Sequence, residues 1–126
     1  MAESGDYQGR KRALVVSISQ YDKLAALDFC EKDGNKIYGV LSQLGYEIPD
    51  KHKLIGGRVE YDKLRDSIYH FFYDKTIDPK DTVLFYFSGH GIVGDDGEHY
   101  LSTSEIDSDL PRLRGFPFDD LTKARE

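Results

Sequence analysis

The sequence contains a single cysteine, Cys30, among its 126 residues. One cysteine cannot form an internal disulfide framework, and it excludes a metal site built from several cysteines. Long apolar runs are also missing, since none approaches the roughly 20 residues that cross a bilayer as a helix. The opening residues, MAESGDYQGRKR, are polar and lead into no hydrophobic signal region. These absences predict a cytoplasmic protein in a reducing compartment.

Basic residues are in the minority. Lys and Arg together number 17 against 23 Asp and Glu, which gives a formal net charge of -6. Proteins that bind nucleic acid neutralise phosphates with basic side chains, so this balance predicts no nucleic-acid partner. The hydrophobic fraction of 39% is ordinary for a soluble globular protein, and the length suits one compact domain.

Several short segments have the composition of strands. RALVVSIS, residues 12–19, and TVLFYFS, residues 82–88, are apolar on successive residues, which predicts strands buried on both faces as in a parallel sheet. A third strand region over 46–57 is interrupted by Pro49, and a short strand is expected over 99–102.

Two segments between these strands show helical spacing of apolar residues, over 30–46 and 60–73. The positions expected to be buried are Ile37, Val40, Leu41 and Leu44 in the first helix and Tyr61, Leu64, Ile68, Phe71 and Phe72 in the second.

The order strand, helix, strand, helix, strand predicts an α/β fold with a largely parallel sheet. Residues 1–11 are expected to be a flexible lead-in, and residues 12–126 one domain. The segment 105–118 is predicted to be irregular, and a helix capped by Asp119 or Asp120 is expected to begin near the end of the sequence.

The stretch LFYFSGHGIVGDDG contains the spacing G-x-G-x-x-G at Gly89, Gly91 and Gly94. A loop that binds a dinucleotide needs a helix after its last glycine, because the helix N-terminus holds the pyrophosphate. Here DDGEHYL predicts a turn into a strand, and Asp95 and Asp96 would repel a phosphate. The pattern therefore does not predict a nucleotide site.

A second interpretation is that the two glycines present His90. They remove side chains on either side of it, at the carboxyl end of a strand, where open α/β sheets place their sites. The amide of Gly91 could then face a reacting carbonyl as an oxyanion donor. The simpler alternative, a flexible turn with a solvent-facing histidine, is about equally consistent with the residues alone.

Four motifs in order then point to a family. KRALVVSISQY, LDFCEKDGNKIYGVLSQLGYE, DTVLFYFSGHG and DGEHYLSTSEID together resemble the caspase-like cysteine peptidases, and among them the metacaspases and their prokaryotic relatives. The resemblance spans residues 12–120. It implies a caspase-hemoglobinase fold, in which a mostly parallel central sheet is flanked by helices and is incomplete without the strand or strands that follow. On this view residues 12–126 are the part that corresponds to the large subunit.

The resemblance also implies roles for individual residues. His90 matches the catalytic histidine of the Cys–His dyad, and Gly91 matches the oxyanion-hole residue. Cys30, Asp33 and Ser88 match residues that flank the P1 side chain of the substrate, and the carboxylate of Asp33 implies a preference for Arg or Lys. The alternatives are a small buried Cys30 and a solvated Asp33 at a helix start.

The nucleophile of the family is not among these residues. It belongs to a D-x-C-x-S-G-like segment, which we expect beyond Glu126, in a continuation or in a small-subunit-like partner chain. Cys30 does not replace it, because Cys30 matches the C-x-x-D motif of the pocket.

Calcium is a further implication of the resemblance. Many metacaspases bind Ca²⁺, and Glu105, Asp119 and Asp120 match the carboxylates involved, with Asp107 as a neighbouring substitute. Hard oxygen ligands suit Ca²⁺, but three carboxylates supply only part of its shell of 6–8 oxygens. A helix cap and a solvated loop explain the same residues equally well.

The function expected from this sequence is thus part of a caspase-like cysteine endopeptidase that cleaves peptides or proteins after Arg or Lys. Alone, the chain is expected to be inactive, because the nucleophile is absent. The alternatives are a caspase-like pseudoenzyme or interaction module, and an unrelated regulatory α/β domain. Neither a membrane nor a nucleic acid is expected as a partner.

Overall fold

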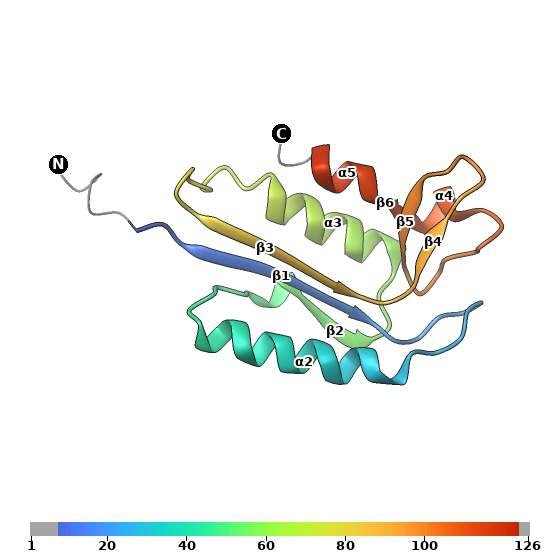
Figure 1. Ribbon diagram of the computed structural model, residues 1–126, viewed down its shortest axis with the longest axis horizontal. Helices are drawn as coiled ribbons and strands as arrows, with labels where there is room; N and C mark the ends of the chain where they lie inside the picture. The colour runs from blue at the N-terminus through green and yellow to red at the C-terminus, as the bar shows by residue number, and fades with distance from the viewer. Residues whose placement is uncertain (1–7, 124–126) are drawn as a thin grey trace.

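A computed structural model describes residues 8–123 of the chain. Its centre is a parallel sheet of three strands in the order β2-β1-β3, followed in the sequence by a second, smaller sheet in the order β4-β5-β6 (Figure 1). The predicted α/β fold with a parallel sheet flanked by helices is confirmed. The elements are β1 (Lys11–Ile18), α2 (Asp28–Gln43), the 3-10 helix η1 (Asp50–His52), β2 (Lys53–Gly57), α3 (Tyr61–Phe72), β3 (Thr82–Ser88), β4 (Gly91–Val93), β5 (His99–Ser102), α4 (Pro111–Arg114), β6 (Gly115–Pro117) and α5 (Phe118–Lys123).

Strand β1 lies between β2 and β3 and is buried on both faces. Its side chains alternate between two cores: Leu14, Val16 and Ile18 pack on the side of α3, and Ala13 and Val15 on the side of α2. Successive residues of a strand point to opposite faces, so a strand covered on both faces needs apolar residues at every position. The predicted burial of this strand is confirmed.

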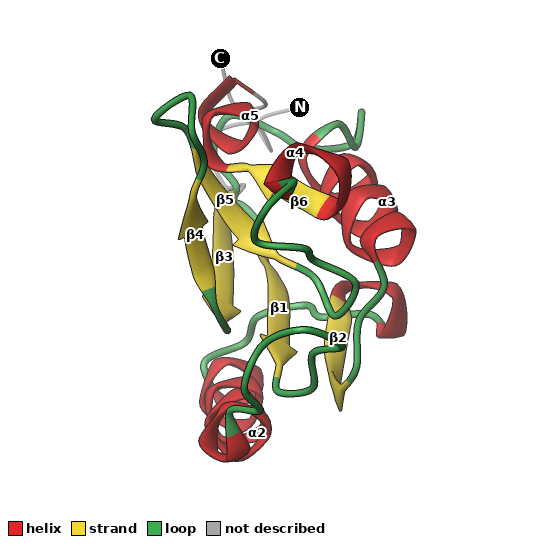
Figure 2. Ribbon diagram, turned by 90° about the vertical axis from the view of Figure 1, so that its right-hand side faces the viewer, coloured by secondary structure: helices red, strands yellow, loops and turns green. Residues whose placement is uncertain are grey.

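Helices α2 and α3 cover opposite faces of the parallel sheet (Figure 2). Four of the five positions predicted to be buried on α3 are confirmed, since Leu64, Ile68, Phe71 and Phe72 lie in the core, whereas Tyr61 at the start of the helix is half-buried. The helix begins at Tyr61, whose amide donates a hydrogen bond to Glu105 Oε1 over 2.9 Å. Within residues 8–123, no helix is both long and apolar enough to cross a membrane.

The predicted buried stripe of α2 is partly wrong. Val40 and Leu44 are 45% and 55% exposed. The face that packs on the sheet is rotated, and its members are Cys30, Gly34, Ile37 and Leu41.

Gly34 explains this rotation. A Cβ atom at this position would lie 2.6 Å from the Cβ of Ser17 on β1, closer than such atoms approach in proteins. The helix therefore contacts the sheet where it lacks a side chain, a packing that an apolar-stripe argument does not detect. The hydroxyl of Ser17 donates a hydrogen bond to the carbonyl of Cys30, which holds the helix at this distance.

Strand β3 packs on both cores, through Phe85 and Phe87 on one face and Leu84 and Tyr86 on the other, but its residues are half-buried and not fully buried as predicted. In the described part of the chain it is the end strand of its sheet and pairs with β1 alone, from Thr82 opposite Lys11 to Ser88 opposite Ser17. Its residues 83–88 are half-buried for that reason. A strand with apolar residues at every position is typical of a sheet interior with a neighbour on each side, whereas β3 has only β1 beside it among the described residues.

The remaining differences lie at boundaries and in loops. Strand β1 begins at Lys11, within the predicted lead-in, and the carbonyl of Arg10 accepts a hydrogen bond from the amide of Thr82. Residues 1–7 of that lead-in lie outside the described residues. The predicted strand over 46–57 is reduced to β2 and follows η1, because the chain turns at Pro49.

In the second sheet the sequence predicts only β5, the strand over 99–102, which is confirmed. Strand β4 forms where a loop was predicted, and α4 and β6 form within the segment predicted to be irregular. Helix α5 begins at Phe118, so Asp119 and Asp120 lie inside its first turn and do not cap it. These elements are three to six residues long, too short for hydrophobic periodicity to detect. Residues 124–126 of the predicted helix lie outside the described residues.

The close contact of α2 with β1 leads to a testable difference between two glycines of one helix. Gly34→Ala should lower the free energy of unfolding by about 1–3 kcal/mol, because its methyl group has no space against Ser17. Gly39→Ala, with nothing within 4 Å of its added Cβ, should raise it by about 0.5–1 kcal/mol. Urea unfolding measures both values, and equal effects of the two substitutions would contradict the packing described.

Candidate active site

His90 lies just beyond the carboxyl end of β3, in the short turn before β4. Parallel strands end at the same edge of a sheet, so the segment that follows β1 reaches this edge too. Tyr21 and Ala25 come from that segment, and both contact His90. His90 thus lies at the carboxyl edge of the sheet, as predicted. There it contacts Tyr21 and Ala25, which precede it by 69 and 65 positions in the sequence.

Tyr21 holds the backbone of this turn. Its hydroxyl accepts a hydrogen bond from the amide of His90 over 2.9 Å and donates one to the carbonyl of Ile18 over 3.1 Å. The tyrosine and histidine rings also meet edge to face, with centroids 4.6 Å apart. One side chain thus connects the end of β1 to the residue that follows β3 by two positions.

Burial raises the pKa of Tyr21 to about 12, although the hydrogen bond from the His90 amide acts in the opposite direction. The phenol therefore keeps its proton throughout the physiological pH range. Because a neutral hydroxyl can donate and accept at once, Tyr21 can serve Ile18 and His90 simultaneously.

The ring of His90 is oriented by a backbone carbonyl. Its Nε2 lies 2.8 Å from the carbonyl oxygen of Ala25. A carbonyl oxygen only accepts hydrogen bonds, so Nε2 must carry the proton and donate it. In the neutral ring the lone pair then belongs to Nδ1, which is the nitrogen that can take up a proton.

The glycines on either side of His90 have different roles. A Cβ at Gly89 would lie 2.6 Å from the hydroxyl oxygen of Tyr21 and 3.1 Å from the ring of Phe87, so this position must be glycine for Tyr21 to reach the turn. A Cβ at Gly91 would meet only the carbonyl of Tyr100, at 4.0 Å. A side chain at position 91 would therefore meet little else in the described structure, and packing does not require glycine there.

The chain after the last glycine of the motif differs from that of a dinucleotide-binding loop. Gly94 leads into a turn and then into β5, not into a helix. A helix N-terminus is what would bind a pyrophosphate, and none follows here. The predicted turn into a strand after Gly94 is confirmed, and the absence of a nucleotide site stays a prediction.

Two serines at the end of β5 and just after it bond to the loops around the site. The amide of Ser102 donates to the carbonyl of His90 over 3.1 Å. Ser104 bonds in both directions with Val59, and its carbonyl accepts from the amide of Asp22 over 2.9 Å. These contacts connect the loops that follow β1 and β2 to the segment after β5. The bond from Ser102 connects the same strand to His90.

The three residues expected to line a P1 pocket lie at this edge but differ in exposure. Cys30 is 1% exposed, in the first turn of α2, while Asp33 is exposed to solvent. Ser88 is half-buried at the end of β3, and its neighbour in the sheet is Ser17, which bonds to the carbonyl of Cys30. They share one region, and their role in binding stays a prediction.

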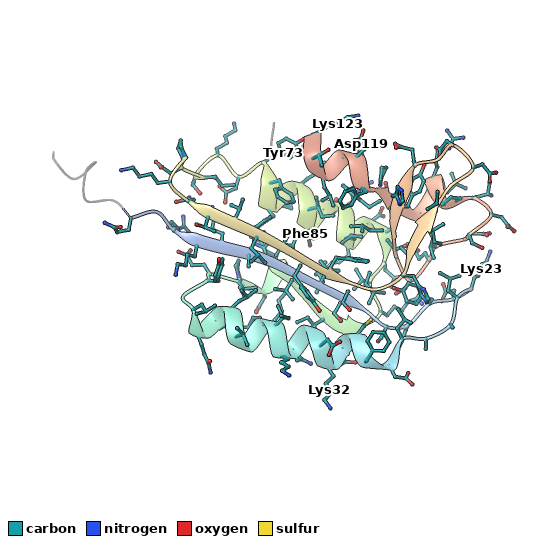
Figure 3. The ribbon with its side chains drawn as sticks, viewed as in Figure 1. Lys23, Lys32, Tyr73, Phe85, Asp119 and Lys123 are labelled. Carbon is teal, nitrogen blue, oxygen red and sulfur yellow. The ribbon has the colours of Figure 1, made fainter. Side chains whose placement is uncertain are left out.

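The carboxylates expected to bind calcium are dispersed. Glu105 accepts the amide at the start of α3, Asp107 pairs with Lys23 over 2.9 Å, and Asp119 pairs with Lys123 along α5 over 3.2 Å (Figure 3). In the described residues, no group of three or more His, Cys, Asp or Glu side chains is arranged to hold a metal ion. This arrangement does not fit the ion, so calcium binding stays a prediction and no step below uses it.

Sequence reasoning missed Tyr21 and Ala25, the two residues that orient His90. Tyr21 carried a weak signal, because an aromatic residue shortly after a buried strand lies at the edge where sites form. Ala25 carried none, since it acts through its backbone carbonyl and any residue type supplies one.

Removing the Tyr21 hydroxyl tests its place in the site. Tyr21→Phe should lower the free energy of unfolding by about 1–3 kcal/mol, because the carbonyl of Ile18 and the amide of His90 both lose a buried partner. Tyr73→Phe, at an exposed tyrosine, is the matched control and should change stability by less than about 0.5 kcal/mol. Urea unfolding of both variants measures the difference, and an equally small effect at Tyr21 would refute the bridging role.

Comparison with known proteins agrees with this arrangement. The family model described as the caspase domain matches residues 10–124, nearly the whole chain and every element described above. Among curated proteins, none matches the chain significantly. A parallel sheet whose third strand ends in Ser-Gly-His-Gly, together with this match, establishes the family: the chain belongs to the caspase-domain proteins, which are related to cysteine peptidases.

Proposed function

We propose that this chain supplies the acid–base and oxyanion groups of a caspase-like cysteine endopeptidase of the metacaspase type, which cleaves after Arg or Lys. The orientation of His90 supports the proposal most strongly. With Nε2 engaged by the carbonyl of Ala25, Nδ1 is left to exchange protons. An exposed histidine in a flexible turn would not need the two contacts from the segment after β1.

In the first step, Nδ1 of His90 takes the proton of a cysteine thiol. The thiolate is the stronger nucleophile, and it attacks the carbonyl carbon of the scissile peptide bond. A carbon–sulfur bond forms, and the carbonyl π electrons move to oxygen. The imidazolium that results still donates from Nε2 to Ala25, so the ring does not have to turn when it becomes charged.

The negative oxygen of this intermediate needs hydrogen-bond donors. The amide of Gly91 lies at a non-hydrogen-bonded position of β4, opposite Leu101, so it points away from β5 and can donate to a carbonyl oxygen. A backbone amide held by a strand is fixed before the reaction begins, which is how such donors lower the barrier.

Breakdown of the intermediate uses the same proton. His90 donates it from Nδ1 to the nitrogen of the leaving amine as the carbon–nitrogen bond breaks, and a thioester remains. Water then attacks the thioester while Nδ1 takes a proton from it. The carbon–sulfur bond breaks, and the thiolate recovers this proton as the acid product leaves.

The thiol does not come from Cys30 in this proposal. Cys30 is 1% exposed and belongs to the face of α2 that packs on the sheet. A side chain so enclosed cannot reach a peptide carbonyl at the edge where His90 lies. We therefore assign the nucleophile to a segment outside the present sequence, consistent with the half-buried apolar edge of β3.

The preference for Arg or Lys rests on Asp33. Its carboxylate is exposed and forms no ion pair with another described residue, so a basic substrate side chain can pair with it. Ser17 and Cys30 are buried where α2 packs on β1, so of the residues expected near P1 only Ser88, half-buried at the end of β3, is partly open to such a side chain.

Substitution of His90 tests the proposal in the complete enzyme, which includes the nucleophile-bearing segment. His90→Ala should lower kcat for peptides with Lys or Arg at P1 by at least about a hundredfold, because both proton transfers lose their carrier. His70→Ala, an exposed histidine on α3, should leave kcat unchanged. A fluorogenic peptide assay measures both variants, and circular dichroism verifies that each is folded.

Two further results complete this experiment. Asp33→Asn should reduce kcat/KM for basic P1 residues about tenfold or more, whereas Glu31→Gln, a second exposed carboxylate of α2, should not. Turnover that survives in His90→Ala would refute the catalytic role. Binding without cleavage by the unaltered complete protein would instead support the alternative of an interaction module.

A further inference from the structure

Strand β4 has a free outer edge in the described part of the chain. It is the end strand of the second sheet, with β5 on one side only. It begins at Gly91, one residue after His90, so this edge starts at the candidate active site. Gly91 and Val93 are both exposed to solvent, whereas Ile92 between them is half-buried.

The register between β4 and β5 determines which backbone groups point outward. The amide of Ser102 donates to the carbonyl of His90 over 3.1 Å, and the amide of Gly94 donates to the carbonyl of Glu98 over 2.8 Å. In an antiparallel ladder hydrogen-bonded pairs alternate with non-hydrogen-bonded ones. His90 and Gly94, the β4-side members of these two bonded pairs, each lie two positions from Ile92. Ile92 and Tyr100, which face each other, are therefore the hydrogen-bonded pair between them.

Gly91 and Val93 consequently occupy non-hydrogen-bonded positions, opposite Leu101 and His99. Their N–H and C=O groups point away from β5, toward the free edge. Two residues of a strand span about 6.6–6.8 Å, which is the spacing at which an added strand repeats its hydrogen bonds. The edge is therefore a template for one more extended chain.

An apolar depression accompanies this edge. A cavity of about 510 Å³ lies between β4, β5 and the start of α5. Gly91 contributes no side chain above Leu101, and the walls include Val93 and Phe118, which are 59% and 50% exposed. An aliphatic side chain that enters the cavity would cover these groups from water.

We propose that β4 binds the polypeptide substrate beside its scissile bond as an added strand, hydrogen-bonded at Gly91 and Val93, with an apolar substrate side chain in this cavity. The inference rests on the proposed function, because the amide of Gly91 that receives the scissile carbonyl is the first group of the same edge. A chain that enters the site at Gly91 in extended form continues directly to Val93. The enzyme thereby selects for an apolar residue near the basic one.

Proline at position 93 tests the edge, because it removes the outward N–H and leaves the β4–β5 ladder bonds in place. Val93→Thr is the matched control, since it keeps the shape and the N–H. The probe is a peptide of about ten residues with one lysine flanked on both sides by valines. NMR titration of the 126-residue chain gives its affinity, and amide hydrogen exchange follows Val93 in the unsubstituted chain.

The peptide should slow exchange of the Val93 amide. Its affinity for Val93→Pro should be about fivefold to tenfold lower than for Val93→Thr, as expected for one lost hydrogen bond, because both variants lose the valine side chain and only Val93→Thr keeps the N–H. Replacing the flanking valines by aspartates should also weaken binding. A peptide in which ester bonds replace the amides at the valines lacks those N–H donors and should bind the unsubstituted chain more weakly. This measurement tests the same edge if Val93→Pro does not fold.

Equal affinities of Val93→Pro and Val93→Thr, with no protection of the Val93 amide, would overturn the proposal. Protection that depends on protein concentration without peptide would overturn it too, because a second copy of the chain would then occupy the edge. Neither measurement requires a thiol or turnover. Failure here therefore differs from failure of the catalytic proposal, which the His90 variant reports.

Discussion

The hydroxyl of Tyr21 is the contact on which this site depends. It joins the carbonyl at the end of β1 to the amide of His90, so the buried strand β1 positions the residue that lies two positions after β3. Gly89 is a consequence of this contact, because any side chain there would collide with the hydroxyl. The histidine loop is therefore fixed by the core and is not a flexible connection between two sheets.

The two sheets orient different groups of the site. The parallel sheet brings the segment after β1 to the end of β3, which fixes the tautomer of His90 through Ala25. The antiparallel sheet directs the backbone of Gly91 outward through its register with β5. His90 and Gly91 are adjacent in sequence, yet each owes its orientation to a different set of partners. The proposed proton carrier and oxyanion donor thus lie at the junction between a parallel and an antiparallel sheet.

Much of this could be predicted where a physical signal is periodic or chemically specific. The buried β1, the face of α3 and the position of His90 follow from apolar runs, helical spacing and a histidine between glycines after a strand. The face of α2 could not be predicted, because Gly34 packs closely through its lack of a side chain. Elements as short as β4 and β6 have no periodicity, and Ala25 acts through a carbonyl that every residue has.

The state of the His90 ring is the most direct test of this account. In the neutral form, ¹⁵N NMR of the imidazole should show the proton on Nε2 and a lone pair on Nδ1, as the contact with the Ala25 carbonyl requires. A ring protonated on Nδ1, or one that exchanges rapidly between the two tautomers, would contradict it. In that case His90 would not be oriented by the segment after β1, and the proton transfers assigned to Nδ1 would lose their structural basis.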